Sequence, residues 1–295
     1  MELNLKRPIA FFDLETTGLN TSHDRIVEMS VLKINVNGDE EQRVWLIRQL
    51  LAEDRQYQGM RIPADERGQK DLLRALMNVR MPRPISEEIL AVQDEYLAEE
   101  NRRSGITDAA LLKPCGISDQ ICLWQGDITT LKADAIVNAA NSGMTGCYQP
   151  LHNCIDNIIG SKAGIRLRLR CHRMMQEQGH PEPTGQAKIT PGYNLPCRYI
   201  IHTVGPIVDG PLTAEHERLL ASCYRSCLNL AEENHLESIA FCCISTGVFM
   251  FPNRRAAEIA VETVISWLSE TGSRMKVVFN VYKDLDRQIY QGLLQ

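Results

Sequence analysis

The chain has 295 residues, of which 44% are hydrophobic, and its formal net charge at pH 7 is −5. This length and hydrophobic content are sufficient for one large domain and a smaller unit. The mildly acidic charge, with acidic and basic residues mixed along the chain, argues against nucleic acid as a partner, because nucleic-acid-binding proteins present a basic surface.

The cellular compartment is indicated by the first residues and by the cysteines. The start, MELNLKRPIAFFDLETTGL, shows neither the apolar core nor the small-residue cleavage site of a secretory signal, and no later window holds 18 uninterrupted apolar residues. We therefore expect a cytoplasmic protein without membrane association. In that compartment the ten cysteines are expected to be buried thiols or metal ligands rather than disulfides.

Residues 1–49 are expected to form a small N-terminal β-hairpin. PIAFFD (8–13) and RIVEMSVLKINV (25–36) are apolar, β-branched segments separated by the polar stretch ETTGLNTSHD, and the turn signal NGD follows the second segment. RVWLI at 43–47 is a candidate third strand.

Residues 50–105 are expected to form a helical extension. Apolar residues recur at helical spacing from Leu72 to Met77, and the prolines of MPRP then interrupt the pattern. Ser86 is the candidate N-cap of a second helix, because two glutamates and an apolar helical pattern follow it.

From residue 106 to the end, short apolar segments (AIVNAA, YIIHTVGP, SIAFCCIS, KVVFNVY) alternate with helical patterns at about 214–233 and 254–269, the latter with Asn253 as candidate cap. This alternation predicts an α/β sheet with helices packed on its faces. In such sheets ligands bind beyond the carboxyl ends of the strands. Polar residues near these expected ends are Asp127, Asn141, Thr203 and Thr246.

The segment GCYQPLHNCIDN (146–157) carries the most specific chemical signal. Cys147, His152 and Cys154 lie within eight positions, and Pro150 argues against a continuous helix, so the three side chains can converge on one zinc ion from an irregular loop. Three protein ligands leave one coordination position open, as in catalytic zinc sites. Two buried thiols beside a loop histidine, or a Cys-His nucleophilic pair, are the alternatives.

The segment STGVF (245–249) follows the apolar pattern IAFCCI and precedes a helix. A strand that runs into a glycine-containing turn can present backbone N–H groups to a diphosphate without positive charge. A plain strand-to-helix turn is the simpler interpretation, since one glycine is a weak signature. Asp127 in GDIT either accepts a hydrogen bond from an adenine amino group or caps a helix, and Asn141 has an equally simple interpretation as a turn residue.

Several separated segments occur in one order: QGDITTLKADAIVNAANSGMTGC, TGQAKIT, YIIHTVGP and SIAFCCISTGVFMFP. Their order and approximate spacing resemble a macrodomain, the ADP-ribose-binding α/β module. GCYQPLHNCIDN and the preceding stretch ALMNVRMPRPIS are similar to the zinc-containing microbial protein ADP-ribosyl hydrolases. The resemblance covers roughly residues 53–290. It implies a three-layer α/β/α fold with a central mixed sheet in residues 106–295.

The resemblance also implies an activity and its ligands. Water would cleave the bond between ADP-ribose and the side chain of a mono-ADP-ribosylated protein, a carboxylate ester, with one zinc ion bound by Cys147, His152 and Cys154. The ion would either bind a ribose hydroxyl or activate the water. Asn141 at the ribose and Asp156, if it faces the cleft as base, are the implied catalytic residues. The implied ADP-ribose-binding residues are Asp127, Ile128, Asn141, Ile155, Asp156, Ser245, Thr246, Gly247, Val248 and Phe249.

Two positions depart from the family pattern. Many macrodomains carry a glycine directly after the aromatic residue of the phosphate loop, whereas Met250 follows Phe249 here. The wider family also tends to show a histidine four residues after the loop aspartate, where this chain has Gly160. A non-catalytic reader that binds ADP-ribose through the same cleft is therefore the alternative function.

The N-terminal stretch has a resemblance of its own. AFFDLETTGL with RIVEMSVLKI is similar to the first motif of the DEDD-type 3′–5′ exonucleases, in which carboxylates matching Asp13 and Glu15 help to bind two magnesium ions. That mechanism needs further carboxylates, and macrodomain-like sequence begins soon after residue 50. We therefore expect a fused fragment without nuclease activity.

Overall fold

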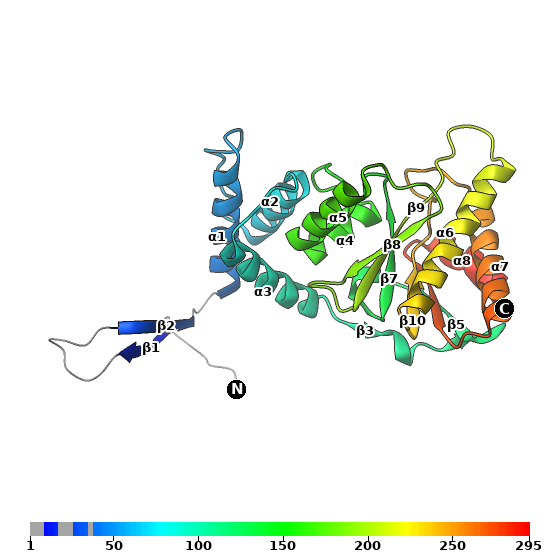
Figure 1. Ribbon diagram of the computed structural model, residues 1–295, viewed down its shortest axis with the longest axis horizontal. Coiled ribbons are helices and arrows are strands. Elements are labelled where there is room, and N and C mark those ends of the chain that lie inside the picture. Colours follow the sequence, from blue (N-terminus) through cyan, green and yellow to red (C-terminus); the bar gives the residue numbers. More distant parts are fainter. Residues whose placement is uncertain (1–8, 17–25, 35–37) are drawn as a thin grey trace.

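The computed structural model describes residues 9–16, 26–34 and 38–295 (Figure 1). Strands β1 (Ile9–Thr16) and β2 (Ile26–Ile34) pair antiparallel, which confirms the expected hairpin. The third strand expected at residues 43–47 is wrong, because this segment lies inside helix α1 (Gly38–Glu53). Leu46, Ile47 and Leu50 share one buried face of that helix, a pattern that a segment of five residues was too short to reveal.

The helical extension consists of α1, α2 (Glu66–Val79) and α3 (Glu87–Arg103). Ser86 is the N-cap of α3, as expected, and its hydroxyl accepts a hydrogen bond from the backbone N–H of Ile89 at 3.3 Å. The expected boundary between residues 49 and 50 falls inside α1, so among the described residues the extension begins at Gly38 rather than at residue 50. The three helices share an apolar core that includes Leu46, Ile47, Leu50, Leu51, Leu73, Leu76, Met77, Leu90, Tyr96 and Leu97.

A seven-stranded sheet forms the centre of the larger unit, in the order β4-β5-β11-β10-β7-β9-β8. The five central strands run parallel, and the edge strands β4 and β8 run antiparallel to their neighbours, so the sheet is mixed. The strands are β4 (Pro114–Cys115), β5 (Ser118–Gln125), β7 (Ala135–Ala140), β8 (Ala187–Pro191), β9 (Tyr199–Val204), β10 (Ser238–Phe241) and β11 (Lys276–Val281). Two short strands, β3 (Thr107–Asp108) and β6 (Leu131–Lys132), pair separately.

Helices cover both faces of this sheet (Figure 1). Helices α4 (Ile155–Ala163) and α5 (Ile165–Gln178) lie on one side, and α6 (Ala214–Glu233), α7 (Asn253–Thr271) and α8 (Asp284–Leu293) lie on the other. Buried strand residues such as Ile136, Ile239 and Val278 form the core with the inner faces of these helices. The arrangement confirms the expected three-layer α/β/α fold.

Helix α7 begins one residue earlier than expected. Pro252 occupies the N-cap position, and Asn253 is the first helical residue rather than the cap. The Asn253 amide instead donates to a carboxylate oxygen of Asp286 at 2.7 Å, which joins α7 to α8. Over the described residues, no helix is long and apolar enough to cross a membrane.

Candidate functional site

A cavity of about 600 Å³ opens beyond the carboxyl ends of the parallel strands. Most of its lining comes from four chain segments at or beyond strand ends: 126–128 after β5, 152–155 between β7 and the first turn of α4, 242–249 after β10, and residues from 280 onward at the end of β11. This is the position at which doubly wound sheets bind ligands, because the loops that leave adjacent parallel strands diverge there. We call this cavity the cleft.

The segment Ser245–Phe249, which we call the phosphate loop, lines the cleft over its whole length. The start of this loop is held by the backbone N–H of Phe251, which donates to Ser245 O at 3.0 Å. The N–H of Val208 donates to Phe249 O at 2.9 Å and anchors the far end. Nothing lies within 4 Å of the position that a Cβ of Gly247 would take, so the backbone there is open to a ligand.

Asp127 lines the cleft and also caps a short 3₁₀ helix, Ile128–Thr130. Its carboxylate accepts hydrogen bonds from Thr129 N at 2.9 Å and Thr129 Oγ1 at 2.5 Å, and Lys162 Nζ lies 3.1 Å away. Burial acts to raise the pKa of Asp127, but the Thr129 hydrogen bonds and the Lys162 charge outweigh it and lower that pKa. A charged acceptor therefore stands at the edge of the cleft, and the two interpretations of Asp127 are compatible.

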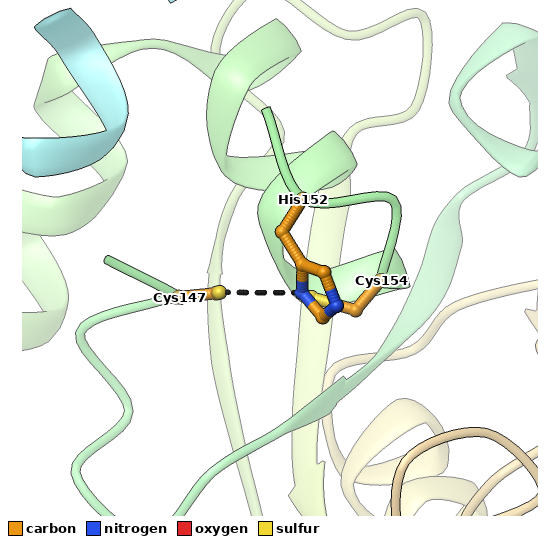
Figure 2. A group of neighbouring side chains, drawn as sticks. All are labelled: Cys147, His152 and Cys154. Atoms are coloured by element: carbon orange, nitrogen blue, oxygen red, sulfur yellow. Dashed lines mark hydrogen bonds between the residues drawn. The ribbon is translucent and has the colours of Figure 1, made fainter. Parts of the chain in front are cut away.

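Cys147, His152 and Cys154 converge from the connection between β7 and α4 (Figure 2). Their potential ligand atoms all lie within 4.8 Å of one another, and Cys147 Sγ is 3.5 Å from His152 Nδ1. Tetrahedral zinc with usual Zn–S and Zn–N bond lengths places sulfur and nitrogen ligands about 3.6 Å apart. The donor types and their separation therefore fit a zinc ion.

Two of these three residues also line the cleft. His152 and Cys154 do so, whereas Cys147 does not belong to the cleft lining. Burial raises the pKa of the Cys154 thiol to about 11. A thiol in this environment is protonated at neutral pH unless a cation binds its sulfur.

Asp156 was expected to act as base only if it faced the cleft. In the structure it does not belong to the cleft lining. It is the second residue of α4, is 7% exposed, and lines a separate interior cavity of about 30 Å³. Its carboxylate accepts from Asn138 Nδ2 at 2.8 Å and from Asn141 Nδ2 at 3.4 Å. Burial raises the pKa of Asp156 to about 6. The residue turns inward because Asn138, on β7, offers a donor that is itself buried.

Asn141 is a turn residue in the structure and does not belong to the lining of the cleft. Its side-chain oxygen accepts from Gly143 N at 2.9 Å, which makes it a turn residue. Its amide nitrogen donates to Gly146 O at 3.1 Å and reaches toward Asp156. Asn141 therefore joins the end of β7 to the start of the segment that carries the metal-ligand candidates.

Several residues that line the cleft were not predicted from the sequence. Asn280 near the end of β11, Tyr282 and Lys283 directly after it, and Asp286 in the first turn of α8 line the cleft together with Asp127. The Asn280 amide donates to Gly126 O at 2.9 Å and so fixes the two strand ends relative to each other. The signal that could have revealed them is the polar stretch that ends KVVFNVYKD, since it follows the last apolar strand pattern.

Asp13 and Glu15, the exonuclease-like pair, lie in β1. Strands β1 and β2 form a two-stranded sheet of their own and do not belong to the seven-stranded sheet that carries the cleft. The position of this pair therefore provides no connection to the cleft chemistry.

Comparison with known proteins identifies the family. The Macro domain family matches residues 137–260. A protein-ADP-ribose hydrolase of Treponema medium is 58% identical over 258 residues, covering 86% of this chain and 98% of that protein. A protein-ADP-ribose hydrolase of Staphylococcus aureus is 57% identical over 222 residues, covering 75% of this chain and 83% of that protein.

Solved structures agree with this relationship. A Trypanosoma brucei macrodomain in complex with ADP-ribose matches with a TM-score of 0.58 and 30% identity, covering 75% of this chain and 95% of that one. An Oceanobacillus iheyensis macrodomain with ADP matches with a TM-score of 0.53 and 39% identity, covering 58% of this chain and 88% of that one. With close identity to curated relatives over most of their length, the chain belongs to the macrodomain family, in the group of the protein-ADP-ribose hydrolases.

Proposed function

We propose that this protein hydrolyses the bond between ADP-ribose and the side chain of a mono-ADP-ribosylated protein, with a carboxylate ester as the linkage. Water adds across that bond, so that ADP-ribose and the unmodified side chain are released. One observation carries the proposal: a single cleft joins Asp127, the phosphate loop, and the ligand atoms of His152 and Cys154. An extended ligand with a base at one end, a diphosphate in the middle and a reacting sugar at the other end fits this order.

The cleft residues divide the ligand between them. Asp127 would accept a hydrogen bond from the adenine amino group, with Ile128 packed against the base. The phosphate loop would bind the diphosphate through backbone N–H groups, which suits an acidic protein because backbone donors need no cationic side chains. Ile155, on the first turn of α4, would border the ribose beside the metal-ligand candidates.

Cys147, His152 and Cys154 would hold one zinc ion beside that ribose. When bound, zinc supplies an open coordination position that can polarise a ribose hydroxyl or lower the pKa of a bound water. Asn141 would contact the ribose next to the bond that breaks. Asp156 would act through Asn141, because its buried carboxylate accepts from the Asn141 amide.

We also propose that the protein acts in the cytoplasm. All ten cysteines of the chain are free thiols in the structure. This supports a reducing compartment, since disulfides persist mainly in oxidising ones.

The experiment is a de-ADP-ribosylation assay on purified full-length protein whose zinc content has been measured. Cys147→Ala is expected to lose zinc and to release ADP-ribose roughly a hundredfold more slowly, because loss of a metal contribution of about 3 kcal/mol has that effect on rate. Cys115→Ala, which removes another half-buried thiol, is the matched control and should retain both properties.

Two other outcomes would each refute part of the proposal, and a third would contradict the expectation that the N-terminal fragment lacks nuclease activity. Full turnover by zinc-free protein would exclude the metal from the reaction. Tight ADP-ribose binding without release from the modified protein would favour the reader function. Magnesium-dependent degradation of single-stranded DNA that disappears in Asp13→Ala would show that the N-terminal fragment has nuclease activity.

A further inference from the structure

The segment that carries the metal-ligand candidates, residues 147–154, contains no helix or strand and has an unfavourable backbone conformation. Leu151 has a φ of 55°, in the left-handed region, where a residue with a side chain costs about 1 kcal/mol. Gly146, at the start of the segment, has a φ of 87°. Contacts from elsewhere in the molecule must therefore hold this segment in place.

Helix α2 of the helical extension contacts the backbone of this segment at Leu151 and at His152. Asn78 Oδ1 accepts a hydrogen bond from the backbone N–H of Leu151, the residue with positive φ, at 3.1 Å. Arg74 Nη2 donates to the carbonyl oxygen of His152, itself a ligand candidate, at 2.6 Å. The same Nη2 donates to Asn157 Oδ1 at 2.9 Å, and the Asn157 amide donates to Gln149 O at 2.9 Å.

Arg168, on α5, joins the end of α2 to the first ligand candidate. Its Nη1 donates to the carbonyls of Met77, Asn78 and Arg80 at 3.1, 2.7 and 2.7 Å, which are free acceptors at a helix C-terminus. Its Nη2 donates to the carbonyl of Cys147 at 3.3 Å. Cys147 at the start of the segment, and Leu151 and His152 near its end, are therefore all tied to the C-terminal part of α2.

Burial makes these contacts stiff. Asn78 is 2% exposed, and its amide also donates to Ser161 Oγ on α4 at 2.9 Å, so its orientation is fixed from both sides. Hydrogen bonds from a charged guanidinium are stronger than neutral ones, and more so where water is excluded. The backbones of Cys147 and His152 are thus both held by charged hydrogen-bond donors.

We propose that Arg74 and Asn78 are positioning residues of the metal centre, and that the helical extension fixes the geometry in which Cys147, His152 and Cys154 bind zinc. The inference rests on the proposed function, because it assumes that the three residues bind zinc. It goes further in giving the helical extension a role in metal affinity. Partners that orient metal ligands typically change affinity about 10- to 100-fold when removed.

The test compares Arg74→Met with Arg67→Met in the full-length protein. Methionine keeps much of the apolar length of the arginine side chain and removes its hydrogen-bond donors. Arg67→Met is the control, because Arg67 lies on the same helix with its side chain 92% exposed. Zinc affinity is measured by competition with a chromophoric chelator, and the thermal midpoint of metal-free protein is measured separately. Arg74→Met should bind zinc about 10- to 100-fold more weakly, whereas Arg67→Met should match the natural chain. Arg74→Lys, which keeps one donor group, should fall between them, and it replaces the methionine variant if that variant does not fold.

Two results would overturn the inference, and they are distinguishable. Natural zinc affinity in Arg74→Met, with or without a lower thermal midpoint, would show that Arg74 serves stability alone. Absence of zinc binding by the natural chain would remove the proposed metal centre, and the inference with it, before any variant is compared.

Discussion

His202 is a buried histidine whose charge state links folding to pH. It lies on β9 and is 1% exposed. Its ring contacts Asn138, which also hydrogen-bonds to Asp156, and Thr190. Asn138 Nδ2 lies 3.1 Å from His202 Nδ1 and also donates to Asp156. Because an amide nitrogen only donates, His202 Nδ1 is the acceptor. The proton of the neutral ring therefore belongs on Nε2, which lies 2.9 Å from Thr190 Oγ1. Cys171 Sγ is 4.0 Å from the same Nε2. The structure therefore accommodates the neutral ring.

The size of the effect follows from the pKa. Burial lowers the pKa of His202 from 6.5 to about 4 in the folded protein. As the pH falls below 6.5, the unfolded chain takes up a proton that the folded protein does not bind, so stability is lost between pH 6.5 and about 4. At about 1.4 kcal/mol per pH unit the full loss is about 3 kcal/mol, of which about 2 kcal/mol falls between pH 7 and pH 4.5.

His202→Gln tests this reasoning. The free energy of unfolding is measured by urea denaturation at pH 7 and pH 4.5, with chelator present so that metal binding does not contribute. The natural chain should lose about 2 kcal/mol more than the variant between these two pH values. His172→Gln, at a half-buried position on α5, is the control and should follow the natural chain. Equal losses in the natural chain and His202→Gln would show that His202 is protonated in the folded protein at the same pH as in the unfolded chain.

Two further predictions concern ADP-ribose binding, which titration calorimetry can measure. Gly205→Ala should weaken binding about tenfold, because the new Cβ would overlap Ser245 Oγ and displace the start of the phosphate loop. Such overpacking costs about 1–3 kcal/mol. In the control Gly210→Ala the new Cβ enters open space, so this variant should bind ADP-ribose normally. Asp127→Ala should weaken binding about tenfold or more and lower the free energy of unfolding by about 1 kcal/mol, since the adenine acceptor and the cap on Thr129 N are both lost. Unchanged affinity in either variant would contradict the assignment of that part of the cleft.

The sequence revealed the fold where the periodic pattern was long enough. The apolar segments of β7, β9, β10 and β11 and the helical patterns of α6 and α7 were all found, because each has the length and period of its structure. RVWLI was misread as a strand, since five apolar and β-branched residues fit either structure. The helix is decided by residues outside that window, such as Leu50 and Leu51, which complete the buried face.

The sequence revealed less of the site. Motif order predicted Asp127, the phosphate loop, Asn141 and all three metal-ligand candidates at one site. In the structure Asp127, the phosphate loop, His152 and Cys154 line the cleft, whereas Asn141 and Cys147 do not. The direction of Asp156 could not be read in the same way. Whether a residue in the first turn of a helix faces a cleft or the core depends on how that helix lies on the sheet, and this is a property of tertiary packing. The contacts of Arg74 and Asn78 are separated by more than 70 residues from their partners, so no local pattern encodes them.

The two departures from the family pattern have different physical consequences. Met250 has a φ of 54°. Glycine adopts this conformation freely, whereas for methionine it costs about 1 kcal/mol of conformational energy. The N–H of Met250 nevertheless donates to Gly247 O at 3.0 Å. The phosphate loop therefore keeps its shape through backbone hydrogen bonds that do not depend on the side chain at this position. Gly160 lines the interior cavity beneath Asp156, and a Cβ there would meet nothing within 4 Å. A larger residue at 160 would extend into that cavity, so this departure alters the surroundings of Asp156 while the departure at 250 leaves the loop intact.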